Sequence, residues 1–147
     1  MRPRLTPTQL AKIQLEYENS AHVPEITFTS VLSRLKPAPL QQSATELLFQ
    51  PGEIIVQEGE VGDAIYIIRS GAVAALKGDL QSPAVLGFCG PGEVVGEIAL
   101  IDNQPRSASL AAIRLTRLVR LRRDTFQALI LQDASVSASL LRTLASR

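Results

Sequence analysis

The middle of the sequence, over residues 44–123, is a series of short apolar runs separated by glycine-containing turns. In order, the runs are TELLF, IIVQ, AIYIIR, AVAALK, AVLGFC and LTRLVRLRR. Strands separated by turns at this spacing are typical of antiparallel sandwiches and barrels. A parallel sheet would need a long crossover between each pair of strands, and the short turns leave no room for one. We therefore predict a mainly β core over residues 44–123.

Several glycines lie where the turns have to be tight. Gly52 and Gly92 each follow a proline, which predicts a type II turn with positive φ at the glycine. Gly59 and Gly62 lie in the turn EGEVGD, and Gly71 lies in the turn SG. These turns set the ends of the predicted strands.

Residues 1–43 are predicted to form a separate helical segment interrupted by prolines. In TPTQLAKIQLEYENSA, the apolar residues Leu10, Ile13 and Tyr17 recur at helical spacing, and Thr8 is the expected N-cap. We expect this segment to contact a partner domain or a second subunit, as in a homodimer.

Residues 124–147 are also predicted to be helical. Asp124 or Thr125 is suited to cap the segment FQALILQD. Further along, three leucines share one helical face: Leu140, Leu141 and Leu144. The pattern reaches Arg147 without a terminator, so we expect a truncated helix and a domain that belongs to a longer protein.

The composition excludes several classes of protein. A chain of 147 residues is about one domain, which buries roughly 70% of its unfolded surface and forms a core without disulfides. No apolar run spans a bilayer, the start lacks a signal peptide, and a net charge of +1 does not attract nucleic acid. Cys89 and His22 are the only residues of their kinds, which excludes an internal disulfide and a zinc site of His and Cys. A cytoplasmic protein without a metal is expected.

The sequence carries no catalytic motif, so an enzyme is not expected. GPGEVVG at residues 90–96 is one residue too long for a dinucleotide-binding loop, and we interpret it as a turn into a strand. A cupin-type metal enzyme would need several barrel histidines. Ser107 and Ser109 have no histidine to activate them, and a serine–lysine pair would require Lys77 from an unrelated turn.

Most of the remaining charged residues are interpreted as solvated. Acidic residues lie on the turns, where solvent exposure is usual. The arginines around the last strand are interpreted as an exposed face, because no aromatic residues or recognition helix accompany them. The acidic residues are Glu53, Glu58, Glu60, Asp63 and Asp79. The arginines are Arg114, Arg117, Arg120, Arg122 and Arg123.

One stretch, GEIALIDNQPRSASL at residues 96–110, places a carboxylate and a guanidinium in an otherwise apolar segment. Gly96 permits a close backbone approach, and the N–H groups of a turn at Glu97 are suited to a small anion. Arg106 follows a proline and precedes small residues, which leave space for a phosphate beside its guanidinium. One interpretation is a sugar phosphate held between Glu97 and Arg106. The other is that Arg106 pairs with Glu97 or Asp102 on the surface.

The same stretch resembles the phosphate-binding cassette of the cyclic nucleotide-binding domain family, whose pattern is G-E-hydrophobic-A-L, a short loop and P-R-[AST]-A. The upstream segments PGE, EGEVGD, IYIIRSG and PGEVVGE match the glycine pattern of that family in order, and the similarity covers residues 30–147. It implies an eight-stranded antiparallel jelly-roll barrel, or double-stranded β-helix, with flanking helices. A helical phosphate-binding cassette and C-terminal lid helices are implied as well.

The resemblance also implies a role for each residue of the cassette. Glu97 is expected to accept a hydrogen bond from the ribose 2′-hydroxyl, and Arg106 is expected to pair with the cyclic phosphate. Backbone N–H groups are expected to complete the phosphate cradle, with a glycine giving access: Ile98, Ala99 and either Ser107 or Ala108, with Gly96. The candidate lid residues are Leu140, Leu141, Leu144 and Arg147. The leucines are equally suited to packing on the barrel.

The expected function is that of a sensor without a cofactor, whose ligand is cAMP or cGMP. Ser107 carries a hydroxyl where many cAMP-selective members have alanine, so it permits cGMP, although we favour cAMP. By the resemblance, ligand binding moves the C-terminal helix and so controls an effector that this chain does not contain. Two alternatives remain: the sensor half of a catabolite-activator-like transcription regulator without its DNA-binding part, and a ligand-free interaction domain on the same barrel.

Overall fold

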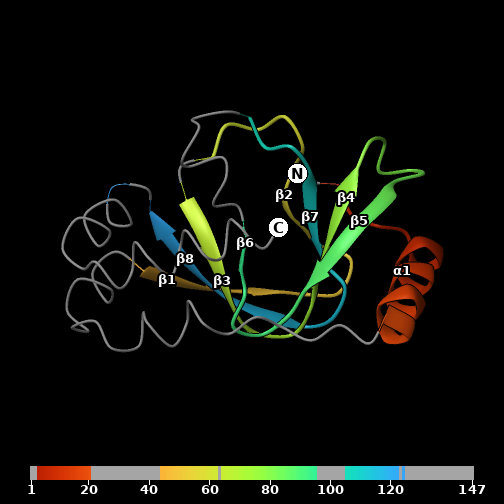
Figure 1. The fold of residues 1–147 in the computed structure, drawn as a ribbon, viewed down its shortest axis with the longest axis horizontal. Helices are drawn as coiled ribbons and strands as arrows, with labels where there is room; N and C mark the ends of the chain where they lie inside the picture. The colour runs from red at the N-terminus through yellow and green to blue at the C-terminus, as the bar shows by residue number, and fades with distance from the viewer. Residues whose placement is uncertain (1–2, 21–43, 63, 96–104, 123, 125–147) are drawn as a thin grey trace.

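The computed structural model describes residues 3–20, 44–62, 64–95, 105–122 and 124. Within these residues, eight strands form two antiparallel four-stranded sheets, β1-β8-β3-β6 and β2-β7-β4-β5 (Figure 1). The strands are β1 (Ala44–Phe49), β2 (Ile54–Val56), β3 (Ala64–Ser70), β4 (Val73–Lys77), β5 (Ala84–Cys89), β6 (Val94–Val95), β7 (Ser109–Ala112) and β8 (Thr116–Arg122). Successive strands mostly change sheet, which is the jelly-roll arrangement. The prediction of a mainly β, eight-stranded jelly roll is confirmed.

The space between the two sheets holds the first of two apolar cores. Side chains from both sheets point into it, and in β3 they alternate, as with Tyr66 and Ile68. The buried members of this core are Ile55, Val56, Tyr66, Ile68, Val73, Val95, Leu110, Ala112 and Leu118. Because burial of one large aliphatic side chain contributes about 1.5–3 kcal/mol, this core holds the sheets together.

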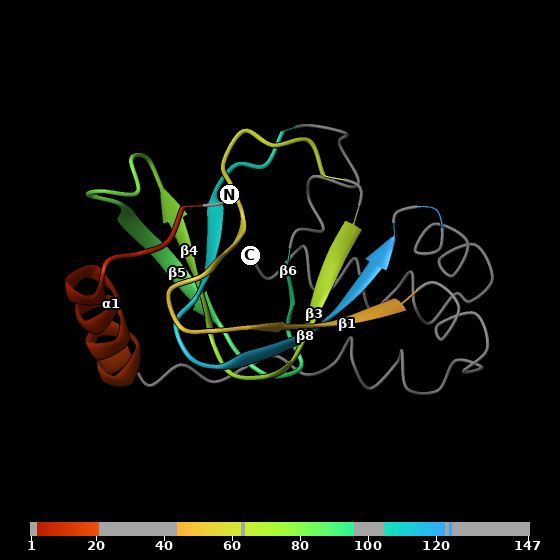
Figure 2. The ribbon, with the colours of Figure 1, turned by 180° about the vertical axis from the view of Figure 1, so that it is seen from behind.

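The sheet β2-β7-β4-β5 is also buried on its other face, where helix α1 (Pro7–Ser20) packs against it. Leu5 and Ile13 are 6% and 4% exposed, and they share a cluster with the fully buried Ala74 and Ala111. In both views α1 lies on the side of this sheet away from β1, β3 and β8 (Figures 1 and 2). Burial on both faces explains why β2 and β7 are buried at every position instead of alternating.

Helix α1 begins with a capping box at Thr6. The backbone N–H of Gln9 donates to Thr6 Oγ1 (3.2 Å), and the N–H of Thr6 donates to Gln9 Oε1 (3.0 Å). Pro7 then takes the first helical position, where its fixed φ is favourable. The predicted cap at Thr8 is therefore wrong, because the cap residue precedes the proline.

No helix within the described ranges is long and apolar enough to cross a membrane.

The Pro-Gly turns have the predicted geometry. Gly52 and Gly92 have φ of 93° and 89°. Each turn is closed by a hydrogen bond from the next residue: Glu53 N donates to Gln50 O, and Glu93 N donates to Gly90 O, both at 3.1 Å. A residue with a Cβ is strained at such a φ, so glycine is required there.

Candidate functional site

The backbone of Arg106 is fixed to the loop that precedes β3. Its N–H donates to Glu60 O (2.7 Å), and its carbonyl accepts from Gly59 N–H (2.8 Å). An isolated antiparallel bridge joins Val61 to Pro105 one residue earlier. These contacts place Arg106 between the 57–62 loop and the start of β7.

The side chain of Arg106 is buried against β3. Only 5% of the residue is exposed. Nη2 donates to Ala64 O at 2.7 Å, and the guanidinium carbon lies 5.9 Å from the centre of the Tyr66 ring. A Cβ at Gly62 would overlap the guanidinium. The burial of Arg106 contradicts its expected position on the surface, whereas its expected partners there, Glu97 and Asp102, lie outside the described residues.

The guanidinium forms part of the wall of a pocket of about 340 Å³. Its polar part comes from Glu60, Tyr66, Arg106 and Arg120, and its apolar part from Leu47, Phe49, Ile55, Val56, Val61 and Gly62. A pocket that combines apolar side chains with two arginines suits a small organic anion. A guanidinium is a fork of donors that matches a phosphate or a carboxylate.

Two charged residues that line the pocket, Glu60 and Arg120, were interpreted from the sequence as solvated. Arg120 is half-buried and lies two positions after the fully buried Leu118 on β8, so both side chains point into the barrel. The expectation of a wholly solvated arginine face is therefore wrong at this position. Three other arginines are exposed and pair with carboxylates: Arg114 with Glu18, Arg117 with Glu46 and Arg122 with Asp124.

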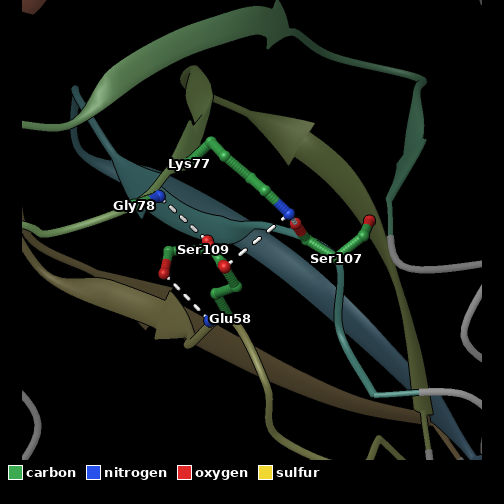
Figure 3. A network of polar contacts seen from close by, with 5 residues as sticks. All are labelled: Glu58, Lys77, Gly78, Ser107 and Ser109. Carbon is green, nitrogen blue, oxygen red and sulfur yellow. Dashed lines mark hydrogen bonds and ion pairs between the residues drawn. The ribbon is translucent and has the colours of Figure 1, made fainter.

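Ser107 and Ser109, which follow Arg106, are held by a small polar network that includes Lys77 and Glu58 (Figure 3). Lys77 Nζ donates to Ser107 O (2.9 Å) and lies 3.6 Å from Glu58 Oε2. The backbone N–H of Glu58 donates to Ser109 Oγ (2.9 Å), while Gly78 N–H donates to Glu58 Oε1 (2.9 Å). The expectation that Lys77 lies in an unrelated turn is therefore wrong. Lys77 contacts the carbonyl of Ser107 and not its hydroxyl. Glu58 is not merely a solvated turn residue.

The other predicted site residues fall outside the described part of the chain. They are Gly96, Glu97, Ile98, Ala99, Leu140, Leu141, Leu144 and Arg147. Cys89 is described and is half-buried, packed against the core between the sheets. In the described residues, no group of three or more His, Cys, Asp or Glu side chains could hold a metal ion.

The sequence model of the cyclic nucleotide-binding domain matches residues 46–133. A cAMP-dependent protein kinase regulatory subunit from Aspergillus fumigatus is 36% identical over 103 residues, which are 68% of this chain and 24% of the relative. A cyclic AMP receptor protein from Thermus thermophilus is 37% identical over 101 residues, covering 68% of this chain and 47% of that protein.

Solved structures agree with these sequence relationships. The regulatory domain of Toxoplasma gondii PKA, crystallised with cAMP, superposes with a TM-score of 0.67 at 27% identity, over 82% of this chain and 47% of that chain. The present chain spans only about a quarter of the fungal regulatory subunits that it matches, from 23% to 25% of their length. The shared unit is therefore one domain of larger proteins.

Proposed function

Because this chain belongs to the cyclic nucleotide-binding domain family, we propose that the pocket beside Arg106 binds cAMP, and cGMP more weakly. The observation that carries the proposal is the burial of Arg106 at the wall of a 340 Å³ pocket. A guanidinium held rigidly at a pocket wall is a fork of donors, and a phosphate can accept two parallel hydrogen bonds from it. A relative crystallised with cAMP has the same fold, which supports this choice of ligand.

The remaining roles in the site follow the family pattern. Glu97 accepts from the ribose 2′-hydroxyl, and Gly96 gives the ligand access. The amides of Ile98 and Ala99 complete the phosphate cradle together with that of Ser107 or Ala108. The Ser107 hydroxyl is compatible with a guanine base, but one hydrogen bond is worth only about 1 kcal/mol. It therefore permits cGMP without excluding cAMP.

In the proposed mechanism, the bound nucleotide shifts the C-terminal helix. Leu140, Leu141, Leu144 and Arg147 are the candidate lid residues. A ligand changes such an equilibrium only by the difference between its affinities for the open and closed states. The lid must therefore contact the ligand in the closed state and lose that contact in the open state. An effector domain or protein reads the movement, and the fragmentary coverage of the relatives is compatible with an attached effector.

The second candidate is the sensor half of a transcription regulator. It is favoured by the similarity to the cyclic AMP receptor protein from Thermus thermophilus, of which this chain covers 47%. Both candidates require a nucleotide in the same pocket. A ligand-free interaction domain on the same barrel would not.

Calorimetric titration with cAMP and with cGMP tests the proposal. The unaltered chain binds cAMP more tightly than cGMP, and Arg106→Gln weakens binding of cAMP by more than about 100-fold, since two charge-assisted hydrogen bonds are lost. Arg106→Lys keeps the charge but loses the paired donors of the guanidinium, so its affinity for cAMP lies between those of the unaltered chain and Arg106→Gln. Arg117→Gln is the matched control, because this arginine is exposed and pairs with Glu46.

Circular dichroism of each variant shows whether it is folded before it is titrated. The absence of heat with both nucleotides would exclude a cyclic nucleotide sensor and leave the ligand-free interaction domain. Unchanged affinity in a folded Arg106→Gln variant would show that the phosphate binds elsewhere.

A further inference from the structure

The structure fixes the direction of two successive peptide units beside Arg106. The carbonyl of Arg106 accepts from Gly59 N–H (2.8 Å), and the carbonyl of Ser107 accepts from Lys77 Nζ (2.9 Å). In a planar trans peptide, the N–H points opposite to the carbonyl. The N–H of Ser107 therefore points away from the 57–62 loop, and the N–H of Ala108 points away from Lys77.

Lys77 is itself held in place by Glu58. The carboxylate has one oxygen 3.6 Å from Lys77 Nζ, and its other oxygen accepts from Gly78 N–H at 2.9 Å. The backbone N–H of Glu58 donates to Ser109 Oγ, which joins Glu58 to the segment of residues 107–109. Figure 3 shows that these contacts close a ring between the 57–62 loop, the end of β4 and residues 107–109.

The ion pair in this ring contributes little to folding by itself. The side chains of Lys77 and Glu58 are 52% and 34% exposed. Exposed pairs of this kind typically contribute about 0–1 kcal/mol, because solvent screens them. Replacement of Lys77 is therefore expected to change the orientation of the Ser107 carbonyl more than the free energy of unfolding.

We propose that Lys77, fixed by Glu58, is a positioning residue for the anion site: it keeps the Ser107 carbonyl away from the bound phosphate. This inference rests on the proposed function, in which the amide of Ser107 or Ala108 donates to the cyclic phosphate. Without Lys77, the peptide between Ser107 and Ala108 is free to rotate and to present the Ser107 carbonyl oxygen to the ligand. A carbonyl facing a phosphate repels it, whereas an N–H attracts it.

The test compares Lys77→Met with the unaltered chain. Methionine keeps most of the length of the side chain but removes the charge and the donor. Calorimetry is expected to show about tenfold weaker binding of cAMP, the equivalent of one lost charge-assisted hydrogen bond. The melting temperature without ligand stays close to that of the unaltered chain, and Lys77→Arg restores affinity to within about twofold.

Three further variants sharpen the test. Arg117→Met removes the same charge from an exposed ion pair with Glu46 and leaves affinity unchanged, which separates positioning from net charge. Glu58→Gln weakens binding less than Lys77→Met does. The double variant of Glu58→Gln and Lys77→Met is no weaker than Lys77→Met alone, because both changes act on the same peptide.

An NMR signature distinguishes positioning from direct contact with the ligand. In the unaltered chain, cAMP shifts the amide resonance of Ser107 or Ala108 downfield, and this shift is lost in Lys77→Met. Unchanged affinity of Lys77→Met would overturn the inference. So would weaker binding with the amide shift retained, since Lys77 would then act directly on the phosphate. Failure of the unaltered chain to bind either nucleotide would instead reject the proposed function.

Discussion

Gly62 is the residue on which the position of the Arg106 side chain depends most directly. An added Cβ would overlap the guanidinium of Arg106, and the φ of Gly62 is not among the positive values found at other glycines. Alanine is therefore acceptable to the backbone at this position and unacceptable to the neighbouring side chain. Gly62→Ala moves the guanidinium without replacing Arg106, which makes it a sharper test of the site than removal of the arginine.

The size of the effect follows from the bonds that the displaced guanidinium loses. One is the 2.7 Å bond from Nη2 to Ala64 O, and the other is one of the two proposed bonds to the phosphate, which the displaced group no longer reaches. Each is a hydrogen bond of a charged group, worth about 1.5–3 kcal/mol. The first loss lowers the melting temperature by roughly 3–12 °C. Part of this fall is offset, because alanine reduces the conformational entropy of the unfolded chain relative to glycine. The second loss weakens cAMP binding roughly 10- to 150-fold.

Gly87→Ala is the control, since it makes the same substitution on β5, away from the guanidinium. Gly87 has open space around its Cβ position and is not among the glycines with positive φ, so alanine there causes neither overlap nor strain. Calorimetric titration and differential scanning calorimetry are carried out on both variants. Gly87→Ala is expected to keep its stability and its affinity, whereas Gly62→Ala loses both. Binding by Gly62→Ala within about twofold of the unaltered chain would refute the assignment of Arg106 as the phosphate ligand.

Two further predictions concern the cap of α1 and the effect of ligand on stability. Thr6→Ala removes the capping box and is expected to cost about 1 kcal/mol, a fall of about 2–4 °C in melting temperature, whereas Thr8→Ala changes it little; equal effects would argue against the cap at Thr6. Saturation with cAMP at about 100 times its dissociation constant stabilises the chain by about 2.7 kcal/mol in thermal melts, and Arg106→Gln at the same concentration shows almost none of this gain; equal gains in both would place the nucleotide elsewhere.

Local patterns in the sequence predicted the parts of the fold that local chemistry determines. The apolar runs correspond to strands, and Pro-Gly predicted the positive φ at Gly52 and Gly92, because both depend on neighbouring residues only. The short strand β7 was not marked as a separate run. It overlaps the end of the site stretch and has small residues at three of its four positions, so its burial depends on α1 and on β4.

The parts of the site that were missed depend on contacts between distant segments. Lys77 and Ser107 are 30 positions apart, and nothing in either neighbourhood indicates that β4 and β7 are paired. Arg120 was grouped with solvated arginines because strand register alone decides that its side chain points inward. The steric role of Gly62 likewise depends on a side chain 44 positions away, since residues 62 and 106 meet only in the fold.

The packing of α1 has a consequence for where this domain can be truncated. Leu5 and Ile13 cover Ala74 and Ala111 on the outer face of one sheet. A fragment that starts at residue 44 would contain every strand but would leave this face open to water. The residues that α1 covers are apolar, so the uncovered face would associate with other molecules. The smallest expressible unit therefore begins before Leu5, and the boundary of the folded body does not coincide with the first strand.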